Sequence, residues 1–242
     1  MKRVLVFLFG VISYAVFFFA FLYAIGFTGN VLVPKSIDTP SDATVLQAFI
    51  INMVLLSIFA VQHTVMARPG FKKWWTKIVG PAMERSIFVL LASLALLLLF
   101  WQWQSMNAII WHVEDPVIAG IIKGIFALGW LIVLLSTFMV NHFHLFGLKQ
   151  VIDNLKNKPQ AELKFVKRYL YKFVRHPIML GFLTAFWATP TMTLGHLIFA
   201  VVTTLYIFIA VKFFEEKDLR KSLGEAYANY QREVPMFIPF TK

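Results

Sequence analysis

The sequence predicts an all-α fold, a multi-pass helical bundle in a membrane, and three observations support this prediction. Of the 242 residues, 59% are hydrophobic and only 14% are charged, which is far from the usual composition of soluble domains. Four apolar segments are long enough to cross about 30 Å of hydrocarbon as helices. The lysines and arginines are also sorted by segment, as membrane orientation requires.

The four expected spans lie in the first 140 residues. Each has close to or more than the roughly 20 apolar residues that a spanning helix needs, and they cover residues 4–27, 43–61, 87–103 and 117–140. The first span follows two cations, but its apolar core is longer than that of a signal peptide and no convincing cleavage site follows. We therefore expect four transmembrane helices in residues 1–140, the first of them retained.

The distribution of cations predicts the orientation of the chain. Of the 23 lysines and arginines, 21 lie before the first span, between the second and third, after the fourth, or after residue 211, whereas the loops 28–42 and 104–116 contain only Lys35. The positive-inside rule then places both termini in the cytoplasm. The net charge of +11 therefore indicates membrane topology and not a nucleic acid partner.

The last apolar stretch, residues 177–211, has basic segments on both sides. It should therefore enter and leave the membrane at one face, as a helical hairpin that turns near residues 190–195. Whether both arms span the bilayer stays open. Residues 141–176 and 212–242 are then expected to form a cytoplasmic cap, and the chain 1–242 a single domain.

The hairpin begins with VRHPIMLG, which places two basic side chains directly before an apolar run. Proline is favoured at the first position of a helix and disfavours helical backbone at the residue before it, so we expect His176 to be the cap and Pro177 the helix start. The free N–H groups there, with Arg175 beside them, form a candidate anion site. The alternative is that Arg175 is only a positive-inside anchor and His176 an ordinary polar cap.

Two adjacent glutamates follow the hairpin, in the stretch KFFEEKDLR. In a continuous α-helix, Glu216 has a cation four residues before it and another four after it, which predicts a solvated charge ladder. Glu215 instead falls on the apolar stripe of that helix. It should therefore need a partner, either a ligand or, as a structural alternative, Arg175.

A cation site and an acidic site at one membrane face suit a zwitterionic ligand that carries an amino-acid group. Three nearby tyrosines, Tyr171, Tyr227 and Tyr230, are candidates for a wall on which a flat part of that ligand stacks. Helical spacing also allows Tyr227 and Tyr230 to pack the cap on the bundle. Both interpretations stay open.

These residues carry a resemblance to a known family. RHPIMLG, followed by EEKDLRKSLGEAYANYQREVPMFIPF, is similar to the RHPxYxG and EExxLxxxFGxxYxxYxxxVPxFIP patterns of the membrane-embedded methyltransferases related to isoprenylcysteine carboxyl methyltransferase. The resemblance implies that the cofactor is S-adenosyl-L-methionine. It implies cofactor contacts from Leu163, Lys164, Phe165, Val166, Tyr171, His176, Pro177, Ile178, Met179 and Glu215, to which the charge argument adds Arg175, Tyr227 and Tyr230.

Two positions depart from the family pattern. Met179 stands where a tyrosine is usual, and Val211 stands where the prenylcysteine enzymes have an arginine that contacts the substrate. The second departure puts a prenylcysteine carboxylate in doubt. The remaining chain, at residues 62–103 and 136–151, resembles a narrower group, the bacterial methanethiol S-methyltransferases, which are NnrU-like proteins.

This narrower resemblance implies methyl transfer from S-adenosylmethionine to the sulfur of methanethiol, a small volatile thiol, giving dimethyl sulfide and S-adenosylhomocysteine. It also implies a bacterial inner membrane as the location, with the lipid bilayer as partner. The runner-up activity is carboxyl methylation of a prenylcysteine-like or other lipid-soluble substrate. From a different class, the chain is a non-catalytic accessory protein or a small-ligand transporter, which would need polar residues along a path through the membrane.

Methyl transfer to a thiol needs the thiolate, so a base is expected. The candidates are His63, His142 and His144, at the predicted cytoplasmic ends of the second and fourth spans. Each alone is better explained as a polar packing or interface residue, so the prediction rests on the group. Desolvation in a dry pocket is an alternative means of activation. No metal site is predicted, because the chain has no cysteine and no acid at ligand spacing. The oligomeric state does not follow from the sequence. Trp74 and Trp75 are expected in an interfacial belt.

Overall fold

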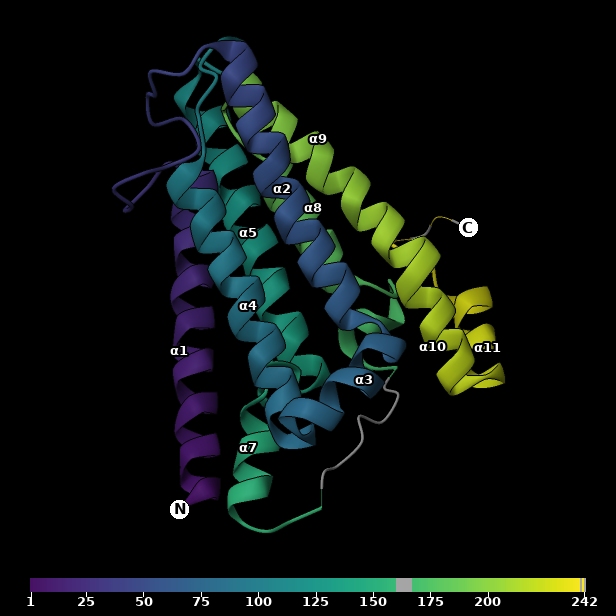
Figure 1. The fold of residues 1–242 in the computed structure, drawn as a ribbon. Coiled ribbons are helices and arrows are strands. Elements are labelled where there is room, and N and C mark those ends of the chain that lie inside the picture. Colours follow the sequence, from purple (N-terminus) through teal and green to yellow (C-terminus); the bar gives the residue numbers. More distant parts are fainter. Residues whose placement is uncertain (160–166, 240, 242) are drawn as a thin grey trace. The chain divides into compact units, whose positions relative to one another are not determined.

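The computed structural model describes residues 1–159, 167–239 and 241, and it is almost entirely helical (Figure 1). Within these residues, five helical stretches are long and apolar enough to cross a membrane. The first four, Lys2–Gly29, Val45–Ala67, Pro81–Gln102 and Pro116–Val140, overlap the four predicted spans along most of their length, and the fifth is Leu194–Leu223. The prediction of an all-α, multi-pass membrane protein is therefore confirmed.

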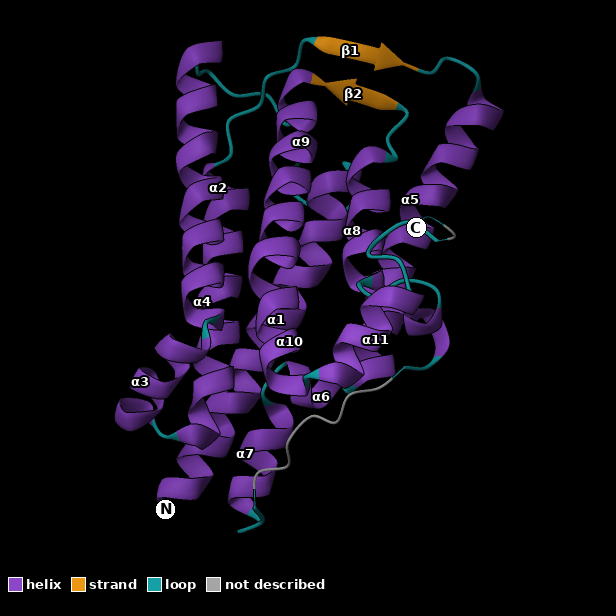
Figure 2. Ribbon diagram, turned by 90° about the vertical axis from the view of Figure 1, so that its right-hand side faces the viewer, coloured by secondary structure: helices purple, strands orange, loops and turns teal. Residues whose placement is uncertain are grey.

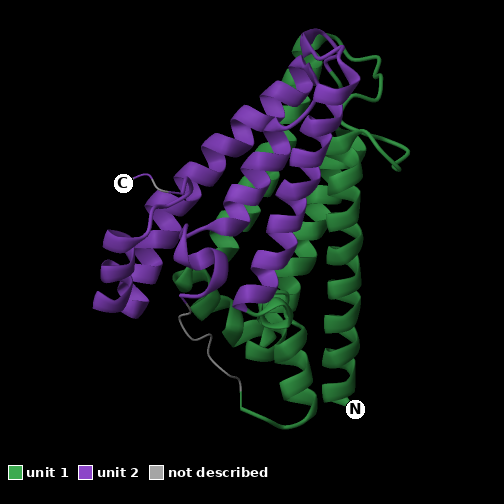
Figure 3. Ribbon diagram, turned by 180° about the vertical axis from the view of Figure 1, so that it is seen from behind, with its two compact units in different colours: residues 1–105, 141–163 green, residues 106–140, 164–242 purple. Residues whose placement is uncertain are grey.

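Contacts divide the chain into two compact units (Figure 3). The first unit comprises residues 1–105 and 141–163, and the second comprises residues 106–140 and 164–242. The prediction of one domain over residues 1–242 stays a prediction. Each unit is described separately below.

The first unit is built on long helices that pack through small residues. Its elements are α1 (Lys2–Gly29), α2 (Val45–Ala67), α3 (Pro69–Val79), α4 (Pro81–Gln102), α6 (His142–Leu145) and α7 (Leu148–Leu155). Helix α1 packs against α4 and α7, and α2 packs against α4. Gly10 allows α7 to approach α1, because a Cβ at that position would lie 2.5 Å from the Val151 side chain.

The two ends of the first unit differ in charge. Helix α7 contacts the amino-terminal part of α1 and the start of α4, so the basic residues near these segments share one end. At the other end, the Trp103 indole donates a hydrogen bond of 3.1 Å to the Ile37 carbonyl. The Lys35 ammonium donates one of 2.6 Å to the Trp101 carbonyl. Loop 28–42, whose only lysine is Lys35, thus lies at the opposite end of the first unit from the basic segments, as the charge pattern predicts.

The second unit contains the remaining elements, including a two-stranded antiparallel sheet that the sequence did not predict (Figure 2). Strand β1 lies in the loop before α5, and Ile109 pairs with Thr193 in β2. Helix α8 packs along α5 through facing glycines, since a Cβ at Gly129 would lie 2.8 Å from the Gly181 carbonyl. The elements are β1 (Ile109–His112), α5 (Pro116–Val140), a 3₁₀ turn (Tyr169–Lys172), α8 (Pro177–Trp187), β2 (Thr191–Thr193), α9 (Leu194–Ile209), a π-helical segment (Ala210–Glu215), α10 (Glu216–Leu223) and α11 (Glu225–Glu233).

The predicted hairpin in residues 177–211 is present as α8 and α9, and its two arms are unequal. Helix α8 has 11 residues, or about 16 Å at 1.5 Å per residue, which is too short to cross the membrane. The preceding segment accounts for this length. The Arg168 side chain bonds the Met139 carbonyl at 3.3 Å and the Tyr171 hydroxyl bonds the Ser136 carbonyl at 3.5 Å, so the chain runs beside the last turns of α5 before α8 begins.

Candidate functional site

The start of α8 is held by the carboxy-terminal tail. Pro177 occupies the first helical position and His176 is the N-cap residue, as predicted. The Arg175 and His176 amides donate hydrogen bonds to the Pro235 and Met236 carbonyls at 2.9 and 3.2 Å. These two main-chain hydrogen bonds leave both side chains free to point toward α10 and α11.

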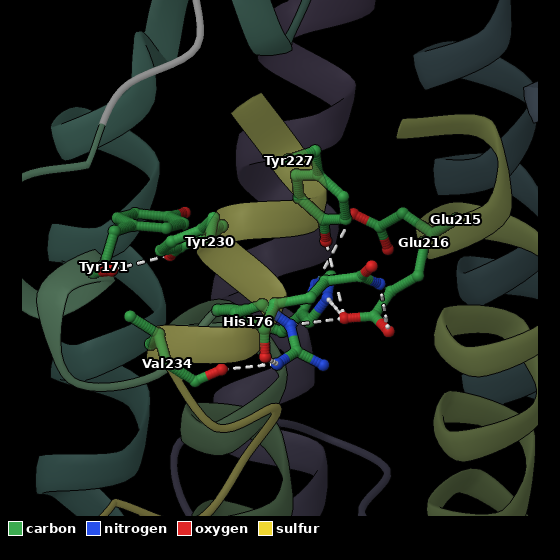
Figure 4. A network of polar contacts seen from close by, with 9 residues as sticks. Tyr171, His176, Glu215, Glu216, Tyr227, Tyr230 and Val234 are labelled. Carbon is green, nitrogen blue, oxygen red and sulfur yellow. Dashed lines mark hydrogen bonds and ion pairs between the residues drawn. The ribbon is translucent and has the colours of Figure 1, made fainter. Parts of the chain in front are cut away.

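Glu216 is the centre of a buried polar network (Figure 4). Its Oε1 atom accepts a hydrogen bond of 2.6 Å from Arg175 Nε, lies 3.2 Å from His176 Nε2, and accepts a longer bond from the Tyr227 hydroxyl. Its Oε2 atom accepts from the Gln231 amide at 3.1 Å. The Arg175 and Glu216 side chains are each only 10% exposed. Their ion pair connects the start of α8 to α10, and the bonds from Tyr227 and Gln231 connect α11 to the same carboxylate.

The two glutamates have exchanged the positions that the sequence predicted. Glu216, expected in a solvated charge ladder, is buried, whereas the Glu215 side chain, expected on the apolar stripe, is 45% exposed. The physical reason is the π-helical segment Ala210–Glu215. The Glu216 amide donates to the Val211 carbonyl, five residues back instead of four. One extra residue in the turn rotates the following helix, so Glu216 lies on the face of fully buried Val211.

The Glu215 carboxylate lies at the edge of this network. Its Oε1 atom lies 3.6 Å from His176 Nδ1. The predicted alternative, in which Arg175 pairs with Glu215, is wrong, because Arg175 pairs with Glu216. The network therefore contains one acid that is satisfied internally and one that is available to a ligand.

The tyrosines pack the cap, as one of the two interpretations predicted. Tyr227 and Tyr230 are 2% and 4% exposed and form an apolar cluster with Val234, and the Tyr230 hydroxyl donates a 2.6 Å bond to the Tyr171 carbonyl. Burial raises the pKa of Tyr230 to about 12. Burial, and then the Glu216 carboxylate, also raises the pKa of Tyr227. These phenols therefore act as donors at neutral pH, and their contact with a cofactor stays a prediction.

A cleft of about 460 Å³ lies beside the network, within the range of small-molecule sites. It is lined by Arg175, by Gln231 and Arg232 of α11, and by the tail from Val234 to Ile238 together with Thr241. The Nη1 atom of Arg175 bonds the Val234 and Gln231 carbonyls. In the described part of the chain the Nη2 atom of Arg175 donates no hydrogen bond, so it remains available to an anion.

The other predicted cofactor residues differ in burial, and some lie outside the described residues. Pro177 is buried, and Ile178 and Met179 are half-buried in the first turn of α8. Burial, and then the Glu215 carboxylate, raises the pKa of Tyr171. The segment with Leu163, Lys164, Phe165 and Val166 lies outside the described residues.

The candidate bases belong to the first unit, where His142 and His63 border one aromatic cluster. The His142 ring lies 4.8 Å from Phe146, and the His63 ring lies 5.0 Å from Phe88. Phe146 packs against the apolar cluster that contains Phe88. Phe17 stacks on Phe146 at 3.7 Å. The surroundings of these two histidines are therefore mostly aromatic.

Each histidine has a different polar environment. The Tyr14 hydroxyl lies 2.8 Å from His142 Nε2, and burial lowers the pKa of His142. Within the described residues, the buried Nδ1 atom of His63 has no hydrogen-bond partner. His144 instead contacts Gln150, whose amide donates a 3.0 Å bond to its carbonyl. His63 and His142 thus have the more aromatic surroundings.

Sequence reasoning missed three members of these clusters, Glu216, Gln231 and Tyr14. A one-residue phase shift in α10 would have revealed the first, because it moves Glu216 onto the apolar face. Gln231 and Tyr14 have no distinguishing signal in the sequence. Among the described residues, no group of three or more histidine, aspartate or glutamate side chains is arranged to hold a metal ion.

The fold and the site together define a multi-pass helical membrane protein with a charged, ligand-sized cleft in its carboxy-terminal cap. The chain belongs to the NnrU protein family, whose family model matches residues 51–235. No solved structure has a significant similarity to the chain.

Curated relatives extend this likeness to nearly the full length. Methanethiol S-methyltransferase of Mycobacterium tuberculosis is 55% identical, over 99% of this chain and 98% of that protein. Methanethiol S-methyltransferase 1 of Bradyrhizobium diazoefficiens is 51% identical, over 99% of this chain and 84% of that one. Nurim of Mus musculus is a more distant relative, 28% identical over 74% of this chain and 71% of its own length.

Proposed function

We propose that this protein is a methyltransferase that transfers a methyl group from S-adenosylmethionine to methanethiol, giving dimethyl sulfide and S-adenosylhomocysteine. The observation that carries the proposal is the near full-length likeness to proteins named methanethiol S-methyltransferase. A second observation supports a small substrate. Val211, which stands where prenylcysteine enzymes have an arginine, is fully buried and offers no cation to a substrate carboxylate.

Arg175, which lines the cleft, and Glu215, which lies beside His176, fit a cofactor with an amino-acid group. The free Nη2 atom of Arg175 suits a carboxylate, and the half-exposed Glu215 carboxylate suits an ammonium group. Glu216 holds the Arg175 guanidinium in place and so limits the motion that binding would otherwise have to arrest. We therefore assign cofactor binding to Arg175 and Glu215, and the positioning of Arg175 to Glu216.

When bound, S-adenosylmethionine supplies an electrophilic methyl group on a sulfonium sulfur. Transfer of that methyl group to the thiol sulfur would require the thiol proton to leave. A neutral imidazole accepts such a proton, and the lowered pKa of His142 keeps it neutral at pH 7. Rate enhancement by such a base is usually about 10²- to 10⁴-fold.

We further propose that the protein resides in the bacterial inner membrane with both termini in the cytoplasm. The basic segments of the first unit lie at the end of α1 that carries the amino terminus. S-adenosylmethionine is a charged, water-soluble cofactor, and a cytoplasmic cleft gives it direct access. Labelling of single cysteines introduced into loops 28–42 and 141–158 of this cysteine-free chain tests the orientation.

The function is tested by mass spectrometry of the product. Purified protein in lipid vesicles receives methanethiol and S-adenosylmethionine with a deuterated methyl group, and a parallel sample receives a prenylated cysteine. We expect labelled dimethyl sulfide in the first sample and no methyl ester in the second. A labelled ester without dimethyl sulfide would replace the proposal with carboxyl methylation.

A further inference from the structure

Helix α3 is set apart from the spanning helices on either side of it. Arg68 has extended backbone and precedes Pro69, which ends α2 and begins the new helix. Gly80, with a φ of 78°, then separates α3 from α4. As a result, α3 runs across the ends of α2 and α4 and continues neither (Figures 1 and 2).

The apolar side of α3 is only partly used by the protein. Phe71 packs against the buried cluster of α2 and α4, and Trp75 is half-buried. Trp74 and Ile78, on the same side at helical spacing, are 52% and 62% exposed. Because the helix is short and both its ends are tied to spanning helices, this exposed apolar strip lies at the level where a membrane ends.

The opposite side of α3 is basic and lacks any nearby acid in sequence. Lys72, Lys73 and Lys77 occupy it, and between Asp42 and Glu84 the chain has no aspartate or glutamate. Lys73 and Lys77 are exposed. In the described portion of the chain, neither forms an ion pair. Among the described residues, the charges of Lys73 and Lys77 are therefore not neutralised by an ion pair.

We propose that α3 lies in the membrane interface and binds anionic phospholipid head groups. Trp74 and Ile78 insert at the boundary of the acyl chains, and Lys73 and Lys77 contact the phosphate groups. An amphipathic helix with tryptophan on one face and lysines on the other is suited to this position. Each lysine near an anionic surface contributes roughly 1 kcal/mol, or about five-fold in local lipid enrichment. The partner is a lipid surface and not a protein because α2 and α4 hold α3 at membrane level.

A single fluorophore tests this proposal. Since the chain has no cysteine, Ile78→Cys gives one thiol at an exposed position for an NBD label. The labelled protein is placed in phosphatidylcholine vesicles with a small fraction of spin-labelled phosphatidylglycerol or, separately, spin-labelled phosphatidylcholine. We expect both lipids to quench the label, and phosphatidylglycerol to do so at least about two-fold more strongly.

Charge variants separate local binding from bulk attraction. Lys73→Gln/Lys77→Gln should remove the excess quenching by phosphatidylglycerol, and Lys73→Arg/Lys77→Arg should retain it. Lys156→Gln/Lys158→Gln, which removes two exposed lysines elsewhere, should also retain it. Equal quenching by the two lipids, or equal loss in both glutamine variants, would overturn the proposal, and so would a label that neither lipid quenches.

Discussion

Glu216 in the second unit contacts four polar side chains, whereas His63 in the first unit lies against Phe59 and Phe88. The first environment holds a charge rigidly, because Arg175, which is closest to the carboxylate, is itself bonded to the Gln231 and Val234 carbonyls. The second environment disfavours charge. The difference suits two tasks of the proposed methyl transfer, which are the binding of a charged cofactor and the removal of a proton from a neutral thiol.

The largest expected effect concerns the histidines. We expect one of three variants to lose about 10²- to 10⁴-fold in kcat while its cofactor affinity changes little. The three variants are His63→Gln, His142→Gln and His144→Gln. We expect this variant to be His63→Gln or His142→Gln, because both histidines have mostly aromatic surroundings. Steady-state kinetics of dimethyl sulfide formation provides the measurement. Three variants with near-normal kcat would exclude a histidine base and favour activation by desolvation alone.

The next effect distinguishes the buried acid from an exposed one. Glu216→Gln leaves the Arg175 guanidinium without its counter-charge, which typically costs about 3–5 kcal/mol for a buried pair. The variant should therefore lose both thermal stability and cofactor affinity. Unfolding in detergent and calorimetric titration measure the two losses.

Glu225→Gln is the control for this variant, since Glu225 is exposed on the neighbouring helix α11. Its thermal stability and cofactor affinity should equal those of the unmodified protein. If Glu216→Gln were as stable as Glu225→Gln, the ion pair with Arg175 would not support the cap.

A smaller effect is expected for Glu215→Gln. Its carboxylate is half-exposed and holds no helix together, so stability should stay within about 0.5 kcal/mol. Cofactor affinity should fall about ten-fold, through the loss of one charge-assisted bond that solvent partly screens. The same titration series measures it. A loss of stability comparable to that of Glu216→Gln would contradict the structure, in which the π-helical segment buries Glu216 and leaves Glu215 half-exposed.

The smallest effect concerns pH. Burial lowers the pKa of His142 in the folded protein, so the unfolded chain binds a proton more readily. The resulting stability is present above the unfolded pKa of about 6.5 and is lost as pH falls through the folded pKa. Thermal unfolding between pH 7 and pH 5 should show a destabilisation that His142→Gln reduces. An unchanged pH profile in that variant would contradict the effect.

Much of this fold follows from the sequence. Apolar length predicts the four spans, and the basic flanks of residues 177–211 predict a hairpin there. The sheet between Ile109 and Thr193 was not predictable, because a pairing of four residues with three leaves no clear periodic signal. The short length of α8 depends on how the segment near Tyr171 runs beside α5, which is a tertiary contact.

The site was predictable in composition but not in detail. His176 and Pro177 specify the helix start locally, so their roles as cap and first residue were correctly predicted. The partner of Arg175 was not, because an α-helical period assigns the inner face to Glu215. The extra residue in the turn that ends at Glu215 transfers that face to Glu216, and single-sequence periodicity does not detect such an insertion.

We propose that Glu215 binds the amino-acid group of the cofactor while Glu216 positions Arg175. Calorimetric titration of the unmodified protein and of Glu215→Gln with two ligands tests it most directly. S-adenosylhomocysteine has the amino-acid group, and 5′-methylthioadenosine lacks it. We expect Glu215→Gln to weaken binding of the first ligand about ten-fold and to leave binding of the second unchanged. Equal weakening of both, or of neither, would contradict it.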